Sequence, residues 1–115
     1  MTKREKVLQQ LVSFSKPLDI LLDEVKRLDW DFDGSSINMD VKHICGVLLR
    51  YINGELTTQD VESWANLVEG REDIDFESSH ATVMDECIYE LANPYLTSVL
   101  SVERAGELIQ LLSRN

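Results

Sequence analysis

The spacing of the apolar residues constrains the fold of this chain more than any other feature of its sequence. Six stretches carry apolar side chains at intervals of three and four residues, and no comparable stretch alternates strictly between apolar and polar residues. Half-buried strands of a sheet would show such alternation. The spacing therefore predicts an all-α fold, a compact single-domain bundle of about five to seven short helices.

Start and stop signals separate these stretches. Pro17 suits the first turn of a helix, and Gly54 stands where a left-handed C-terminal cap is needed. Thr57 resembles a helix N-cap, and Pro94 cannot continue a helix. The expected helices cover residues 3–14, 17–28, 41–52, 57–69, 79–92 and 101–112, and an acidic linker is expected over 71–79.

The apolar face of each expected helix predicts the core. Periodicity places the longest amphipathic stripe in the second helix and gives the third helix a wide apolar girth, which is typical of a central element. The predicted inward residues are Val7, Leu8, Leu11, Val12, Leu18, Leu21, Leu22, Val25, Leu28, Val41, Ile44, Cys45, Leu48, Ile52, Val61, Trp64, Ala65, Val68, Val83, Met84, Cys87, Ile88, Leu91, Val102, Ala105, Leu108, Ile109 and Leu112.

Length and composition fit one domain. A chain of 115 residues with 43% hydrophobic residues can bury a core without disulfides or metal ions, so we expect residues 1–115 to form a single helical domain. Cys45 and Cys87 lie within apolar runs, which favours buried thiols over a secreted disulfide framework. The sequence shows no signal-peptide pattern and no apolar run of about 18 residues. We expect a cytoplasmic protein with no membrane partner.

Charge is distributed very unevenly along the chain. From Glu55 to Glu90, eleven acidic residues accompany one basic residue, Arg71, so this acidic third carries 1 − 11 = −10, equal to the net charge of the whole chain. Such an excess repels itself, so it indicates either a docking surface for a positive partner or a solvated surface that keeps the protein soluble. Direct binding of nucleic acid is disfavoured, because phosphate contacts require clustered Lys and Arg.

Segment 29–40 imitates a calcium-binding loop. It places carboxylates at alternate positions before a glycine, as a 12-residue EF-hand loop does. However, Ser36 replaces the usual aliphatic residue, and Asp40 replaces the bidentate glutamate. We favour an acidic turn anchored by Trp30 and Phe32, and keep calcium binding as the alternative. The ligands would be Asp29, Asp31, Asp33 and Asp40.

No set of residues predicts catalysis. His43 and Cys45 are two residues apart and point to different faces of a helix, and His80 stands at a helix start. Glu62 and Glu69 share an exposed helical face, without the apolar pocket that an acid–base pair needs. We expect no enzyme activity, no catalytic residue and no cofactor.

An acidic surface can instead occupy the basic groove of a nuclease and block substrate entry, with long-range attraction that salt weakens. Arg71 is expected to brace the acidic segment through a carboxylate pair rather than contact the partner. The residues expected to face the partner's cations are Glu62, Glu69, Glu72, Asp73, Asp75 and Glu77. Aromatic anchors for such an interface are Trp30, Phe32, Tyr51, Tyr89 and Tyr95, although aromatic residues more often belong to a core.

Four runs of residues carry a resemblance to known proteins. They are Arg50-Tyr51-Ile52-Asn53-Gly54-Glu55-Leu56-Thr57, Trp64-Ala65-Asn66, Glu69-Gly70-Arg71-Glu72-Asp73-Ile74 and Glu90-Leu91-Ala92-Asn93-Pro94. Over residues 40–112 the chain resembles small all-helical bacterial proteins, and it is similar to the immunity proteins of contact-dependent growth-inhibition systems.

This resemblance implies a one-to-one inhibitor of a cognate toxin domain, acting in the cytosol without catalytic residues. It assigns no binding residues. The expectation that the toxin is a nuclease comes from the sign of the surface alone. The alternative function is a calcium-binding or structural helical interaction module that uses the loop of residues 29–40.

Overall fold

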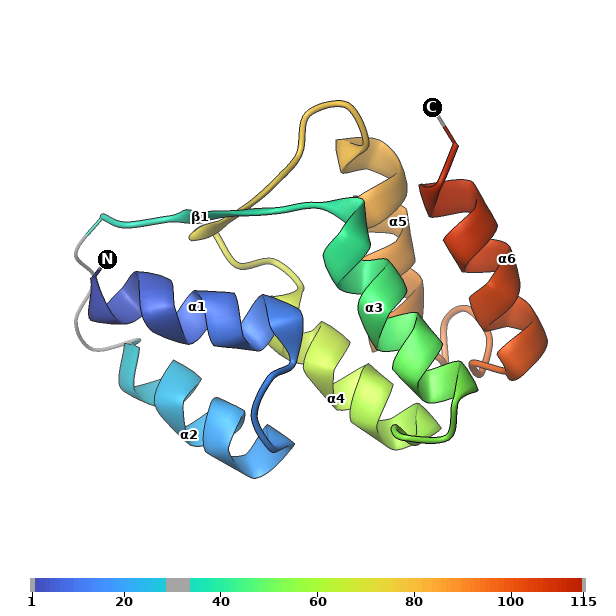
Figure 1. Cartoon of the computed structure of the whole chain (residues 1–115), viewed down its shortest axis with the longest axis horizontal. Coiled ribbons are helices and arrows are strands. Elements are labelled where there is room, and N and C mark those ends of the chain that lie inside the picture. Colours follow the sequence, from blue (N-terminus) through green and yellow to red (C-terminus); the bar gives the residue numbers. More distant parts are fainter. Residues whose placement is uncertain (1, 29–33, 115) are drawn as a thin grey trace.

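The computed structural model describes residues 2–28 and 34–114, and within them the chain folds as a bundle of six short helices (Figure 1). This confirms the predicted all-α fold. The helices are α1 (Lys3–Ser13), α2 (Leu18–Leu28), α3 (Val41–Ile52), α4 (Thr58–Val68), α5 (Ala81–Ala92) and α6 (Val102–Leu112). No helix in the described residues is long and apolar enough to cross a bilayer.

Side-chain caps fix the starts of four helices, including α3, which Asp40 caps. The Thr2 hydroxyl accepts from the Glu5 N–H at 3.1 Å, and the Glu5 carboxylate accepts from the Thr2 N–H at 2.9 Å. Thr57 and Asp60 form the same reciprocal pair at α4, at 3.1 and 2.8 Å, and Ser101 caps α6. Each cap stabilises its helix by about 1 kcal/mol, because it satisfies amide donors that the first turn leaves free. The predicted caps at Thr57 and Ser101 are confirmed.

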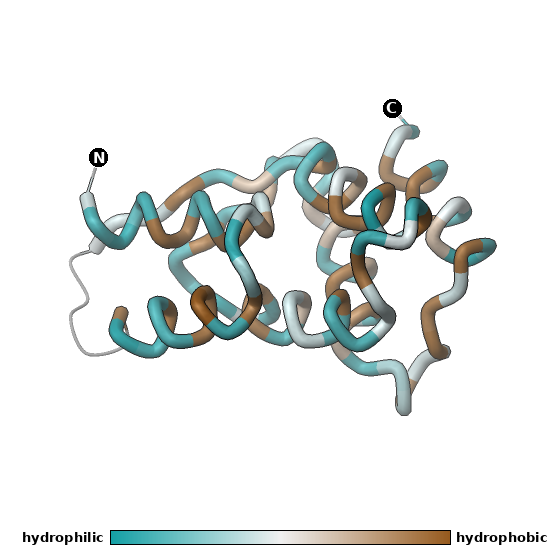
Figure 2. Tube along the Cα trace, turned by 60° about the horizontal axis from the view of Figure 1, so that its bottom comes forward, coloured by the Kyte–Doolittle hydropathy of each residue, from teal (hydrophilic) through white to brown (hydrophobic). Residues whose placement is uncertain are grey.

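The core is built mainly from the predicted helix faces. Trp64 is fully buried, lies against Phe14 with ring centroids 6.3 Å apart, and donates from its indole N–H to the Leu11 carbonyl at 2.6 Å. Figure 2 shows hydrophobic residues recurring along each helix among hydrophilic ones. Two predicted core residues are wrong: Leu22 is 40% exposed and Val102 is 56% exposed.

Two short strands join the bundle and were not predicted. β1 (Ile37–Met39) pairs in parallel with β2 (Ile74–Phe76), so that Ile37 lies opposite Ile74. The apolar residues Ile37, Met39 and Ile74 face the core. Residues 74–76 of the segment expected as an acidic linker therefore pair with β1, which fixes their backbone.

Candidate interaction surface

The six acidic residues predicted to contact a partner differ widely in exposure. Glu72 and Asp75 are exposed, Glu62, Glu69 and Glu77 are half-buried, and Asp73 is only 5% exposed. Glu69, Glu72 and Asp73 line one open depression of about 310 Å³, whereas Glu62 lines a separate recess beside the C-terminal end of α5. The structure brings three of the six together.

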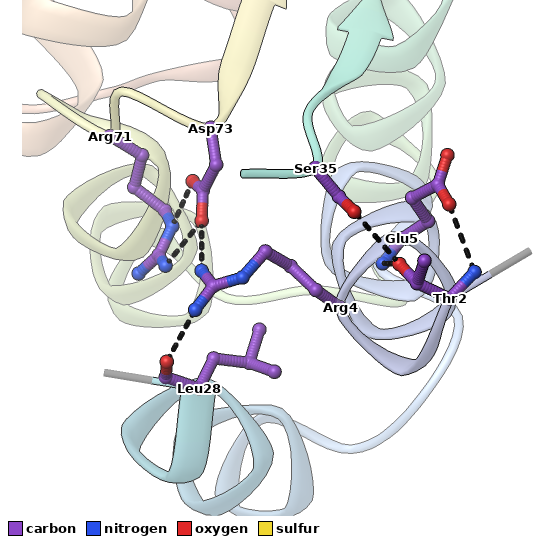
Figure 3. Close-up of polar contacts among 7 residues, drawn as sticks. All are labelled: Thr2, Arg4, Glu5, Leu28, Ser35, Arg71 and Asp73. Atoms are coloured by element: carbon purple, nitrogen blue, oxygen red, sulfur yellow. Dashed lines mark hydrogen bonds and ion pairs between the residues drawn. The ribbon is translucent and has the colours of Figure 1, made fainter. Parts of the chain in front are cut away.

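Asp73 is the anionic centre of an ion-pair cluster (Figure 3). Its carboxylate accepts from Arg4 Nη1 at 2.6 Å and from Arg71 Nε and Nη2 at 2.8 and 2.9 Å. Arg4 also donates to the Leu28 carbonyl at the end of α2. The Asp73 oxygens already bind two guanidinium groups inside the protein, so little of this carboxylate is accessible, and its contact with a partner remains a prediction. The predicted bracing role of Arg71 is confirmed.

Arg4 is the ion-pair partner of Asp73 that the sequence interpretation missed. It lies in the basic N-terminal group, which is typical of a solvated terminus, yet only 3% of it is exposed. The signal was its spacing, since positions 4, 7, 8 and 11 share the inward face of α1. The cluster ties α1 and the end of α2 to the segment that leads into β2.

The two arginines set the charge state of Asp73. Burial alone would raise the pKa of this carboxyl, but the hydrogen bonds and positive charges of Arg71 and Arg4 together outweigh burial and lower the pKa below its usual value. Asp73 is therefore ionised at neutral pH, and its charge is cancelled inside the protein.

Two more predicted contact residues also bind groups within the chain. Glu69 accepts from Asn93 Nδ2 at 3.0 Å, and Glu77 accepts from the Val41 N–H at 3.1 Å at the start of α3. These carboxylates hold helix ends in place. Binding to a partner remains a prediction for Glu69 and Glu77, which would serve it only with oxygens not used in these bonds.

Five carboxylates of the acidic third form no hydrogen bond or ion pair with the described residues. We call them the unpaired carboxylates: Glu62, Glu72, Asp75, Asp85 and Glu86. They lie on or beside α4, β2 and α5, and α5 packs against both α4 and β2. Asp85 and Glu86 share an exposed face of α5 with Tyr89, which is 47% exposed.

The loop between α5 and α6 exposes a group of apolar side chains. Tyr95 is 97% exposed, Leu96 is 72% exposed and Val99 is 69% exposed, and Val102 follows at the start of α6. Figure 2 shows this loop protruding at the lower right, with hydrophobic stretches along it. We call these four residues the apolar loop. Of the aromatic anchors predicted from sequence that the structure describes, Tyr95 is the most exposed, whereas Tyr51 is half-buried.

The structure gives Asp40 a role other than calcium binding. Its carboxylate accepts from the Lys42 N–H at 2.9 Å and lies 3.3 Å from His43 Nδ1, so it caps α3. The other three predicted calcium ligands, Asp29, Asp31 and Asp33, lie outside the described residues, as do Trp30 and Phe32. Within residues 2–28 and 34–114, no group of three His, Cys, Asp or Glu side chains is arranged to hold a metal ion.

The histidines and cysteines also have local roles. His80 Nδ1 lies 2.8 Å from Ser79 Oγ, and His80 Nε2 lies 2.9 Å from the Arg114 carbonyl, which links the start of α5 to the end of α6. Burial raises the pKa of Cys87 to about 12 and also raises that of Cys45. Both cysteines are therefore protonated thiols at neutral pH, which are poor nucleophiles.

Comparison with models of protein families, with curated proteins and with solved structures finds no match to this chain. The resemblance to immunity proteins therefore remains a prediction.

Proposed function

We propose that this chain is an immunity protein that binds and neutralises a cognate toxin domain. The proposed toxin is a nuclease with a basic active site. The chain neutralises it by covering that site with its acidic surface. The observation that carries the proposal is the group of unpaired carboxylates on neighbouring elements of the fold.

The carboxylates of the acidic third fall into two groups, those that bind groups within the chain and those that do not. Six of its eleven carboxylates bind groups within the chain and serve the fold: Glu55, Asp60, Glu69, Asp73, Glu77 and Glu90. The other five form no ion pair or hydrogen bond with the described residues. Their mutual repulsion is relieved when cations of a partner approach, and a field of this sign speeds the encounter by about 10- to 1,000-fold at low salt.

The scaffold holds part of this surface rigid. The pairing of β2 with β1 fixes Asp75, and the Arg71–Asp73 pair fixes the backbone beside Glu72. A surface ordered before binding loses less conformational entropy in the complex. This favours a tight stoichiometric inhibitor over a flexible charged tail.

Co-expression tests the proposal. The chain is expressed in bacteria together with the toxin domain encoded beside its own gene, and growth is measured. We expect the wild-type chain to restore growth, the purified pair to form a 1:1 complex, and the complex to have lost nucleic-acid cleavage. Absence of a complex, or a complex with undiminished toxicity, would contradict the proposal.

A matched pair of variants links protection to charge. Glu72→Lys with Asp75→Lys reverses two exposed, unpaired charges and is expected to weaken protection. Lys3→Glu with Lys6→Glu reverses two exposed charges on α1 and is expected to leave protection unchanged. Equal protection by both variants would show that the acidic surface is not the binding surface.

A further inference from the structure

We infer that the apolar loop anchors this complex by inserting Tyr95, Leu96 and Val99 into an apolar recess on the partner, and that the rim of this recess is basic. The inference rests on the proposed function and specifies the chemistry of the partner's surface. It assigns the strongest contacts to a loop that lies outside the acidic segment.

Exposure makes the loop unusual. Single exposed apolar residues are normal, but contiguous apolar patches on a small protein mark binding sites. Here Tyr95 and Leu96 are adjacent and are 97% and 72% exposed, and Val99 and Val102 follow within seven residues of Tyr95. No other described residue covers these side chains, so they are exposed to water in the free protein.

The loop is rigid enough to serve as an anchor. The single Thr97 hydroxyl proton is shared between the Glu90 carbonyl at 3.1 Å and the Asn93 carbonyl at 2.9 Å, which fastens the loop to the end of α5. On its other side, Leu100 is 9% exposed, and the Tyr51 hydroxyl donates to its carbonyl at 3.2 Å. The loop is thus held at both ends, and little entropy is lost when it enters a recess.

The charge around the apolar loop indicates which kind of partner covers it. Glu62 and Glu90 line the recess beside the loop together with Pro94, Ser98 and Leu100, and the exposed Glu103 follows Val102. Arg104, in the first turn of α6, already binds Glu90 through both carboxylate oxygens at 2.7 and 2.8 Å. Glu62, Glu90 and Glu103, taken together with Arg104, leave net negative charge beside the loop. A partner that covers them needs Lys or Arg around its own apolar recess.

A second copy of this chain is a poor occupant. Each copy has a net charge of −10, and pairing two apolar loops would bring the acidic rims together. Like charges at close range oppose that contact. A basic domain is stabilised in the complex both by burial of the apolar side chains and by attraction between its cations and the acidic residues beside the loop.

The test measures Kd and the dissociation rate with the toxin domain that passes the co-expression test. The variant is Tyr95→Ser with Leu96→Ser. Its matched control is Ile20→Ser with Leu22→Ser, which removes two apolar side chains that are 42% and 40% exposed on α2. All four sites are exposed, so both variants are expected to fold, which thermal unfolding checks.

We expect the loop variant to raise Kd by at least about 30-fold, through faster dissociation, while the control keeps the wild-type Kd. An unchanged Kd of the loop variant overturns the inference and leaves the proposed function intact. If the wild-type chain binds no toxin domain, the proposed function fails and this inference fails with it.

Sedimentation velocity of the isolated chain tests whether a second copy of the chain, rather than a basic partner, covers the apolar loop. We expect a monomer. A dimer that forms in the wild type and disappears in the Tyr95→Ser with Leu96→Ser variant would show that a second copy covers the loop, and would overturn the choice of a basic partner.

Discussion

Replacing Asp73 by alanine is expected to lower the free energy of unfolding by about 3–5 kcal/mol, the usual cost of removing one partner from a buried ion pair. The substitution deletes the acceptor of three hydrogen bonds from Arg4 and Arg71. Hydrogen bonds to charged groups contribute about 1.5–3 kcal/mol each, and Arg71 recovers part of this loss by turning to solvent. Arg4 has no such escape, because its side chain is 4% exposed.

Thermal unfolding measures this cost directly. With an unfolding entropy of about 2 cal/mol/K per residue, a chain of 115 residues loses about 4 °C of Tm per kcal/mol, so Asp73→Ala is expected to lose about 12–20 °C. Asp75→Ala is the matched control, since it removes an exposed carboxylate two residues away and is expected to change stability by less than about 0.5 kcal/mol. Equal Tm losses in the two variants would refute the assignment of Asp73 to a buried cluster.

The pH dependence gives the same prediction a second readout. The folded pKa of Asp73 is lowered, so its stabilisation is complete above the unfolded pKa and is lost as pH falls through the folded pKa. The stability difference between wild type and Asp73→Asn is therefore expected to be constant between about pH 5 and 7 and to close below about pH 4. A difference that widens in acid would contradict the sign of the shift.

Three further predictions test the core, the thiols and the calcium alternative. Trp64→Phe is expected to lower the free energy of unfolding by about 2–3 kcal/mol, because it leaves a cavity and removes the donor to the Leu11 carbonyl; chemical denaturation measures the change, and a near-neutral result would contradict the observed burial. Cys87, with its pKa raised to about 12, is expected to resist alkylation by iodoacetamide at pH 7.5 unless the chain unfolds, so rapid labelling of the native protein would refute its burial. Calorimetric titration with calcium is expected to show no binding heat, because Asp40 caps α3, whereas submillimolar binding abolished by Asp31→Ala would revive the calcium loop.

Helical periodicity predicted the helices almost to the residue, because each helix buries one apolar face. The first and fourth helices show this best: Val7, Leu11, Val61 and Val68 were all placed correctly in the core. Val102 was misplaced, since it begins α6 beside an exposed loop where no neighbour covers it. Periodicity reports the face of a helix but not whether another element reaches that face.

The two strands escaped prediction because each has only three residues. Ile37-Asn38-Met39 and Ile74-Asp75-Phe76 both alternate between apolar and polar residues, but alternation over three positions is too short to distinguish from chance. Their pairing joins segments 37 residues apart, which no local pattern encodes.

Charge counting located the acidic third but did not separate structural carboxylates from unpaired ones. That separation depends on tertiary contacts, such as the approach of Arg4 to Asp73 across 69 residues of sequence. The exposure of Tyr95 likewise depends on where neighbouring elements lie. The sequence offered several aromatic residues as anchors. Only the three-dimensional arrangement shows that Tyr95 is the most exposed of those that the structure describes.

The association rate of the chain with its toxin domain, measured by stopped flow over a range of salt concentrations, tests the central claim most directly. For the wild type we expect a rate that falls steeply with salt. For Glu72→Lys with Asp75→Lys we expect a slower rate with a flatter salt dependence, at unchanged Tm. Asp73 stays out of this variant because its charge supports the fold. Equal rates and equal salt slopes in the two proteins would contradict the account.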